Sequence, residues 1–151
     1  MAGLELGASF YSDRLLGPDG NNANERIYSI HGALERNAAE IIAEYAHVSH
    51  ERVTGTLDFP GSDRYYIQFG YRPRGSASSF KPYVRVEQVV VPTDAYVLGL
   101  LALNYDGVVA GVRCDPGVFL ALRLEYRYEQ FEGLATTNSL CAQASFVLAG
   151  S

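Results

Sequence analysis

The sequence predicts an all-β protein folded as an up-and-down antiparallel transmembrane β-barrel of about eight strands. Three observations predict it: apolar and polar residues alternate along nearly the whole chain, long and short connections alternate, and tyrosines recur among the apolar positions. A period of two places one set of side chains on each face of a strand. At 151 residues the chain has the size of one domain, so we treat residues 1–151 as a single barrel.

The clearest strand runs from Leu120 to Glu129. Its odd positions carry Arg and Glu from Arg123 onward, and its even positions carry three leucines and then two tyrosines. Similar alternation predicts further strands around residues 4–11, 65–72, 83–87, 108–115 and 139–148. With the two strands of a hairpin described next, the pattern gives eight strands, a share of sheet far above that of an average domain.

The segment from Arg26 to His50 predicts a hairpin whose tip is Asn37-Ala38. This register places Tyr28 opposite His47 and Ile30 opposite Tyr45 on the apolar face, and His31 opposite Glu44 on the polar face. The two faces match across the hairpin, as a real register requires. Glu35 opposite Glu40 is the unfavourable pair, tolerable only at a solvated end.

A second hairpin is predicted around Asp115-Pro116-Gly117, as a three-residue loop with Gly117 in a left-handed conformation. The connections then fall at residues 13–25, 36–39, 50–63, 73–79, 90–107, 115–117 and 132–137. Because every second connection of a meander lies at the same end, we expect long loops at one end and short turns at the other.

Which face points inward decides between two kinds of barrel. A soluble lipocalin-like barrel that binds an apolar small molecule would hold Leu120, Leu122 and Leu124 inside, whereas an outer-membrane barrel would turn them toward lipid. The alternating loops, the strand lengths and the tyrosines on the apolar face favour the membrane interpretation. A third alternative is an engineered or truncated barrel scaffold, because the chain shows no signal peptide and ends in Gly-Ser.

Several runs resemble the strands of bacterial outer-membrane porin-like barrels. They include Val108–Arg113 followed by Asp115-Pro116-Gly117, Ala121–Arg127, Thr137–Leu140, Ser145–Leu148, Glu44–His47 and Arg64–Gln68. The resemblance covers most of the chain, although the chain lacks the terminal aromatic residue common in that family and is shorter than most members. It implies either a small complete barrel or the C-terminal part of a larger porin, located in the bacterial outer membrane.

On the membrane interpretation the polar face would line the lumen. We predict twelve lumen-lining residues: Glu5, His31, Glu44, Gln68, Arg72, Arg85, Glu87, Arg113, Arg123, Glu125, Arg127 and Glu129. An eight-stranded barrel has room only for side chains, so these charges should interlock and leave little or no open pore in a monomer. A small charged pore or ligand site is the alternative. We also expect Glu44 to raise the pKa of His31.

We predict a protein that is not an enzyme and that needs no cofactor or metal. His47 and His50 face opposite ways on a strand, so they cannot share one metal ion without a bend. No serine has the spacing of a nucleophile. Cys114 and Cys141 fall on opposite faces with a strand between them, so we expect two free thiols.

The expected partner is a lipid bilayer, and assembly of several copies stays open. A net charge of −5 excludes the electrostatic signature of nucleic-acid binding. No apolar run reaches the ~18 residues of a spanning helix. The segment from Val97 to Leu103 does not alternate; we interpret it as an apolar loop over the barrel mouth or at the bilayer edge, or alternatively as an extra strand. The transported or bound species is not determined by the sequence.

Overall fold

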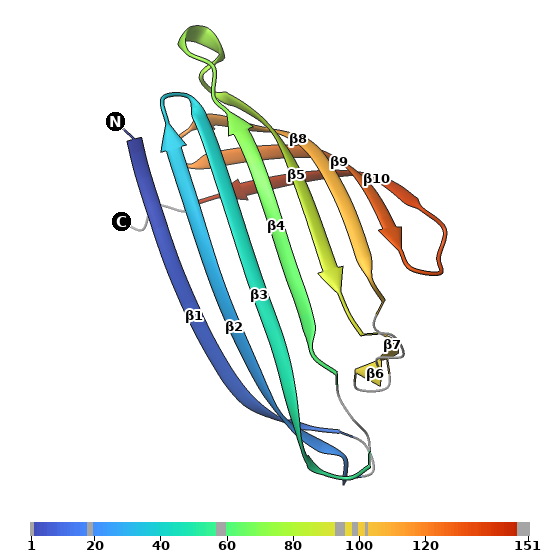
Figure 1. Cartoon of the computed structure of the whole chain (residues 1–151). Helices are drawn as coiled ribbons and strands as arrows, with labels where there is room; N and C mark the ends of the chain where they lie inside the picture. The colour runs from blue at the N-terminus through green and yellow to red at the C-terminus, as the bar shows by residue number, and fades with distance from the viewer. Residues whose placement is uncertain are drawn as a thin grey trace.

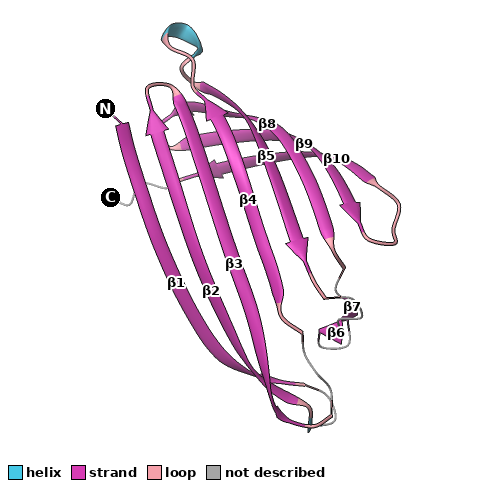
Figure 2. Ribbon diagram, in the orientation of Figure 1, coloured by secondary structure: helices cyan, strands magenta, loops and turns pink. Residues whose placement is uncertain are grey.

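The computed structural model describes residues 2–17, 20–56, 60–92, 96–97, 100–101 and 103–147. Strands make up almost all of it, with one short 3-10 helix beside them (Figure 2). The elements follow one another along the chain as β1 (Ala2–Leu16), β2 (Asn22–Arg36), β3 (Ala39–Thr54), β4 (Ser62–Tyr71), η2 (Gly75–Ala77), β5 (Phe80–Val90), β6 (Tyr96–Val97), β7 (Leu100–Leu101), β8 (Tyr105–Gly117), β9 (Leu120–Phe131) and β10 (Thr137–Phe146). No helix in these ranges is long and apolar enough to cross a membrane.

Eight strands form one antiparallel sheet in the order β1-β2-β3-β4-β5-β8-β9-β10. Each strand therefore pairs with the neighbours that precede and follow it, which confirms the predicted up-and-down meander of eight strands. In the described part of the chain, β1 pairs only with β2 and β10 only with β9. The sheet thus has two free edges.

The β2–β3 hairpin has the predicted register. Tyr28 lies opposite His47, and His31 lies opposite Glu44. The turn residue Asn37 has a φ of 58°, a left-handed conformation that asparagine tolerates better than most residues. Glu35 does face Glu40, but Lys81 Nζ lies 2.9 Å from both carboxylate oxygens of Glu40 and compensates the like charges.

The β8–β9 hairpin differs from the prediction. Asp115-Pro116-Gly117 still belongs to β8, and the turn is the two-residue Val118-Phe119, which leaves Gly117 opposite Leu120. Gly117 is not among the glycines with positive φ. A β-bulge between Cys114 and Gly117 absorbs the extra residues, so the faces stay matched without a left-handed glycine.

The connections alternate between the two ends of the sheet, but several are shorter than predicted. We call the end with connections 17–21, 55–61, 91–104 and 132–136 the loop end, and the end with 37–38, 72–79 and 118–119 the turn end. The predicted loops at 13–25 and 50–63 were too long because β1, β2 and β3 continue through polar residues. Connection 72–79 at the turn end contains η2 and has eight residues, more than the five of 17–21 or of 132–136 at the loop end. The expected division into long loops at one end and short turns at the other is therefore met only in part.

The apolar segment after β5 does not add a strand to the main sheet. Tyr96 pairs with Leu101 and Val97 with Leu100, which makes a separate two-stranded ribbon of β6 and β7. In Figure 1 this ribbon lies at the loop end. The side chains of residues 93–102 lie outside the described part, so the predicted cover over the barrel mouth stays a prediction.

The two faces of the sheet differ in polarity and curvature. We call the face that carries Leu120, Leu122 and Leu124 the outer face, and the face that carries Arg123 and Glu125 the inner face. Outer-face hydrogen bonds such as Tyr45–Asp63 join neighbouring strands, whereas inner-face contacts also skip a strand, as in Tyr83–Glu125 from β5 to β9. The inner face is therefore concave, and Figure 1 shows the sheet curling so that β8, β9 and β10 pass behind β1 to β4.

Candidate functional site

The outer face exposes large apolar side chains over all eight strands of the sheet. Leu120, Leu122 and Leu124 are 38%, 41% and 46% exposed, whereas Glu125 on the opposite face is 2% exposed. A water-soluble sheet has the reverse pattern, because burial of apolar area drives its folding. This orientation is the one that the membrane interpretation requires and the opposite of a lipocalin-like barrel.

Aromatic residues concentrate near both ends of this outer face. At the turn end they are the last residue of β4, the first of β5, a turn residue and the last of β10: Tyr71, Phe80, Phe119 and Phe146. Toward the loop end they are Phe10, Tyr28, Tyr45, Tyr65, Tyr126 and Tyr128. Between the two groups the outward residues are aliphatic or small, except for Phe69 on β4. Two aromatic girdles around an apolar band are typical of outer-membrane barrels.

Three tyrosine hydroxyls of the loop-end group, those of Tyr45, Tyr65 and Tyr126, bond to polar side chains beside them or nearer the loops. Tyr126 donates a 2.6 Å hydrogen bond to Asn138 Oδ1, and Tyr45 donates one of 2.5 Å to Asp63 Oδ1. His47 Nδ1 lies 2.9 Å from the same oxygen of Asp63. Asp63 lies outside the apolar stretch of β4, and the hydrogen bonds from Tyr45 and His47 hold its pKa below the usual value.

The height of the apolar band matches a bilayer. On β9 the outward residues are apolar or aromatic from Leu120 to Tyr128. At about 3.3 Å per residue and a tilt of about 40°, such a run rises roughly 20 Å along the membrane normal. Outer-membrane barrels show apolar bands of about 25 Å, so the outer face has nearly the dimensions that lipid requires.

On the inner face, the register arranges charges in rows that run straight across the strands. One row joins Gly7, His31, Glu44, Tyr66, Glu87, Gly107 and Glu129, and is acidic. The next row toward the turn end contains Arg85 and Arg127, the next contains Glu40 and Glu125, and the last contains Lys81, Arg113 and Arg123. Acidic and basic rows alternate, with Glu5 in the first arginine row as the exception.

Glu125 is the centre of this network. Arg127 donates to Glu125 Oε2 through Nη2 at 2.6 Å and Nε at 3.0 Å. Tyr83 donates to Oε1 at 2.5 Å, and Arg123 Nη1 lies 3.6 Å from that oxygen. The Glu125 side chain is only 3% exposed, so these charge-assisted contacts offset the cost of burying its charge.

A second cluster surrounds Glu87, nearer the loop end. Tyr105 donates to Glu87 Oε1 at 2.6 Å and lies 3.3 Å from Glu129 Oε1. Arg85 Nε is 3.0 Å from Glu87 Oε2, an ion pair that lacks hydrogen-bond geometry. The Arg85 guanidinium also lies over the Tyr66 ring, 5.9 Å from its centre, so an aromatic face shares in neutralising this cation.

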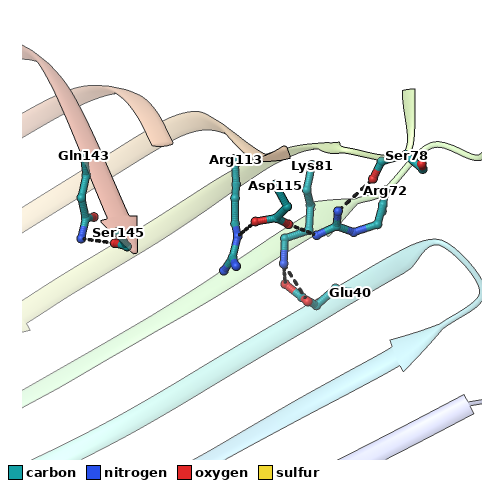
Figure 3. Close-up of polar contacts among 8 residues, drawn as sticks. All are labelled: Glu40, Arg72, Ser78, Lys81, Arg113, Asp115, Gln143 and Ser145. Carbon is teal, nitrogen blue, oxygen red and sulfur yellow. Dashed lines mark hydrogen bonds and ion pairs between the residues drawn. The ribbon is translucent and has the colours of Figure 1, made fainter. Parts of the chain in front are cut away.

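At the turn end, Asp115 bridges two arginines across the sheet (Figure 3). Arg113 Nε donates to Oδ1 and Arg72 Nη2 to Oδ2, each at 2.7 Å. Arg72 also donates to the Ser78 carbonyl at 2.8 Å, which ties connection 72–79 to β8. Figure 3 also shows Lys81 against Glu40, so ion pairs at this end of the inner face join β3 to β5 and connection 72–79 to β8.

The histidines and cysteines lie as the alternation predicts. His47 contacts Asp63 on the outer face, whereas His50, with a side chain 3% exposed, is on the inner face, 3.0 Å from Glu25 Oε2 and from the Pro60 carbonyl. Within the described ranges, no group of three or more His, Cys, Asp or Glu side chains could hold a metal ion. Cys114 and Cys141 are free.

The twelve residues predicted to line a lumen all fall on the inner face or, for Arg72, just beyond β4 on the same side. Those that the structure joins into polar clusters are Arg72, Arg85, Glu87, Arg113, Arg123, Glu125, Arg127 and Glu129. Glu44 lies opposite both His31 and Tyr66. Among the described contacts, Glu5, His31 and Gln68 make no hydrogen bond or ion pair.

The sequence-based selection missed the two tyrosines that bond to these acids. Tyr83 on β5 crosses Gly111 of β8, where a Cβ would meet Tyr83 Cζ at 2.6 Å, and Tyr105 lies over Gly107 of its own strand, where a Cβ would collide with the Tyr105 hydroxyl. The signal in the sequence was Gly107 and Gly111 at polar-face positions of a strand, where missing side chains leave room for a neighbour.

Comparisons with known proteins add no relative. No family model matches the chain, and no curated protein or solved structure matches it.

Proposed function

We propose that this chain is a porin-like, non-enzymatic β-barrel protein of the bacterial outer membrane. In this proposal its lumen is filled by the Arg/Glu network, with little or no open pore in a monomer. The observation that carries it is the polarity of the sheet: leucines and tyrosines on the convex face, and buried Glu87 and Glu125 on the concave face. A sheet with apolar side chains on its convex face is stabilised when that face contacts lipid rather than water.

The two aromatic girdles support the membrane part of the proposal. Tyrosine favours the boundary between hydrocarbon and headgroups, because its ring is apolar and its hydroxyl forms hydrogen bonds. The hydroxyls of Tyr45 and Tyr126 bond to Asp63 and Asn138 on the loop side of the band. These bonds support a boundary between hydrocarbon and headgroups at the loop side of the apolar band.

The alternating charge rows support a filled interior. The interior of an eight-stranded barrel is just wide enough for side chains, and here large side chains from β5, β8, β9 and connection 72–79 already meet on the inner face through Glu125, Glu87 and Asp115. Each arginine of these clusters pairs with an acid: Arg72 and Arg113 share Asp115, and Arg123 and Arg127 share Glu125.

The first test is detergent dependence. We expect the full chain to refold into detergent micelles or lipid vesicles with a strong β-sheet circular dichroism signal, and to aggregate when refolded in buffer alone. A chain that is monomeric and folded in buffer without detergent would contradict the membrane proposal. It would favour a water-soluble barrel with an apolar ligand, which the exposure of Leu120, Leu122 and Leu124 makes difficult.

The second test is conductance. We expect the protein, once inserted into a planar bilayer, to give no reproducible single-channel steps. The matched variant replaces Glu125, Arg123 and Arg127 by serine and should give steps, because it removes the central charges and their bulk. Regular steps from the unmodified protein would overturn the filled-lumen part of the proposal and leave the membrane part intact.

A further inference from the structure

The two free edges of the sheet carry unpaired backbone groups. The unpaired edge of β1 extends over Ala2–Leu16, and the unpaired edge of β10 extends over Thr137–Phe146. Unpaired strand edges promote association in water and are not tolerated in hydrocarbon, where no water can satisfy an exposed N–H or C=O group. The edges therefore require partners, and the register of the sheet indicates which.

The register carries a systematic stagger. The row that starts at Gly7 on β1 crosses all eight strands and ends at Thr137, the first residue of β10. Rows that start farther along β1 leave the sheet at the loop end before they reach β10: the row from Ala8 passes Gln88 and Asp106 and ends at Gln130 on β9. A pairing straight across would thus leave most of β1 without a partner.

We propose that the free edge of β10 pairs with the free edge of β1 of the same chain, antiparallel and shifted by about eight residues. Closing a barrel requires such a stagger, and this is the largest even shift that keeps all of Thr137–Phe146 opposite Ala2–Leu16. Phe146 then faces Leu6, Cys141 faces Tyr11, and Asn138 faces Arg14. In this register every residue of β10 lies against β1. The inference rests on the proposed membrane function, which requires a closed barrel, and it specifies the seam.

The faces match along this seam. Phe146 beside Leu6 and Ala142 beside Phe10 continue the apolar outer face, and Cys141 beside Tyr11 continues the inner face. An offset changed by one residue would turn one strand inside out. Only an even offset therefore keeps the leucine and phenylalanine side chains of both strands on the outer face. The proposed offset is even.

Size complementarity across the interior indicates closure within one chain rather than between two copies. In an eight-stranded barrel, β1 lies across the interior from β5. The inner face of β1 carries Gly3, Glu5, Gly7 and Ser9, whereas that of β5 carries Tyr83, Arg85 and Glu87, so mostly small residues and one acid would lie across from larger side chains that include an arginine.

A similar size relation holds for β10 and β4: Ser139, Cys141 and Ser145 on β10 would lie across from Tyr66 and Gln68 on β4. Glu40 and Glu44 on β3 would lie across from the alternating Arg123, Glu125, Arg127 and Glu129 of β9. In a sixteen-stranded barrel of two copies these surfaces would be separated by a wide lumen, and neither size nor charge would need to match.

A cysteine ladder tests the seam with the full chain folded in detergent. In a Cys114→Ser background, the native Cys141 is combined with Glu5→Cys, Ser9→Cys, Tyr11→Cys or Asp13→Cys, all on the inner face of β1. After mild oxidation, we expect the Tyr11→Cys variant to form an intramolecular disulfide to near completion. Directly paired strand residues lie about 5 Å apart, inside disulfide range, and residues two positions away lie about 7–8 Å apart.

The ladder contains its own controls. The Glu5→Cys variant should stay reduced, because its residue lies on the same strand and face but six positions from Tyr11. If Glu5→Cys links as fast as Tyr11→Cys, the register is wrong. If the Tyr11→Cys variant does not fold, an outer-face pair reports on the same register: Phe10→Cys with Ala142→Cys, in a background without the native cysteines.

The outcomes separate the seam from the membrane function. Disulfide-linked dimers from a membrane-inserted protein would overturn closure within one chain and leave the membrane proposal standing. A chain folded in buffer without detergent would contradict the membrane proposal whichever edge pairs. In the Tyr11→Cys variant, an intramolecular disulfide between position 11 and Cys141, formed in detergent or vesicles, supports both the seam and the membrane proposal.

Discussion

The phenol of Tyr83 on β5 crosses strand β8 above Gly111 and donates a 2.5 Å hydrogen bond to Glu125 Oε1 on β9. This one contact links β5 to β9 across β8. Residues on adjacent strands could not make it. The contact exists because the sheet is concave on this side and because position 111 has no side chain.

Gly111→Ala should weaken the fold by about 1–3 kcal/mol, the usual cost of forcing extra volume into a packed site. The new methyl group would push against the Tyr83 ring and displace it from Glu125. Gly3→Ala is the control, since a Cβ at Gly3 meets nothing within 4 Å. Urea unfolding in detergent measures both, and equal free energies of unfolding would contradict the role given to Gly111.

Glu125→Ala should cost about 3 kcal/mol, because it leaves Arg127 and the Tyr83 hydroxyl without their buried acceptor. The matched change Glu51→Ala removes an ion pair with Arg26 whose two side chains are 46% and 61% exposed, and should stay within about 0.5 kcal/mol. The measurement is the free energy of unfolding of each of the two variants, compared with that of the unmodified protein. A small effect at Glu125 would mean that the buried network adds no net stability.

Leu124→Arg should impair insertion into lipid vesicles, because it places a charge in the middle of the apolar band. On the lipid face of a barrel such a charge costs about 2–4 kcal/mol at the bilayer midplane. Val118→Arg is the control, since Val118 lies in the β8–β9 turn and is 86% exposed. Equal insertion of the two variants, measured by vesicle flotation, would argue against lipid contact at Leu124.

The Asp63 carboxylate should titrate below its usual range, because Tyr45 and His47 both bond to it. A folded-state pKa below the unfolded one means that Asp63 stabilises the fold above its unfolded pKa of about 3.8, and that this contribution is lost as the pH falls through the folded pKa. Tyr45→Phe should raise the pKa of Asp63, as followed by carboxyl carbon NMR. An unchanged titration would show that the Tyr45 bond does not hold in solution.

Much of the fold could be predicted from short-range patterns. The β2–β3 register followed from Asn37-Ala38 at the tip and from matched faces on either side, since a tight turn fixes which residues meet. The β8–β9 turn was misplaced because Asp115-Pro116-Gly117 has the composition of a loop, and the bulge that keeps it in the strand depends on Arg72 and Arg113 binding Asp115. The prediction of a loop over residues 13–25 was wrong for a similar reason, since polar residues there belong to β1 and β2 and pair across the sheet.

The sequence by itself determined which side chains share a face, because alternation is a local property of an extended backbone and does not depend on what lies beyond it. Alternation alone therefore places Leu124 and Glu125 on opposite sides of the sheet. Only the tertiary structure decided which of those sides is concave, and which residues of distant strands touch. Curvature and stagger arise from the pairing of all eight strands together, so Tyr83, Gly111 and Glu125 form one contact only in the complete sheet.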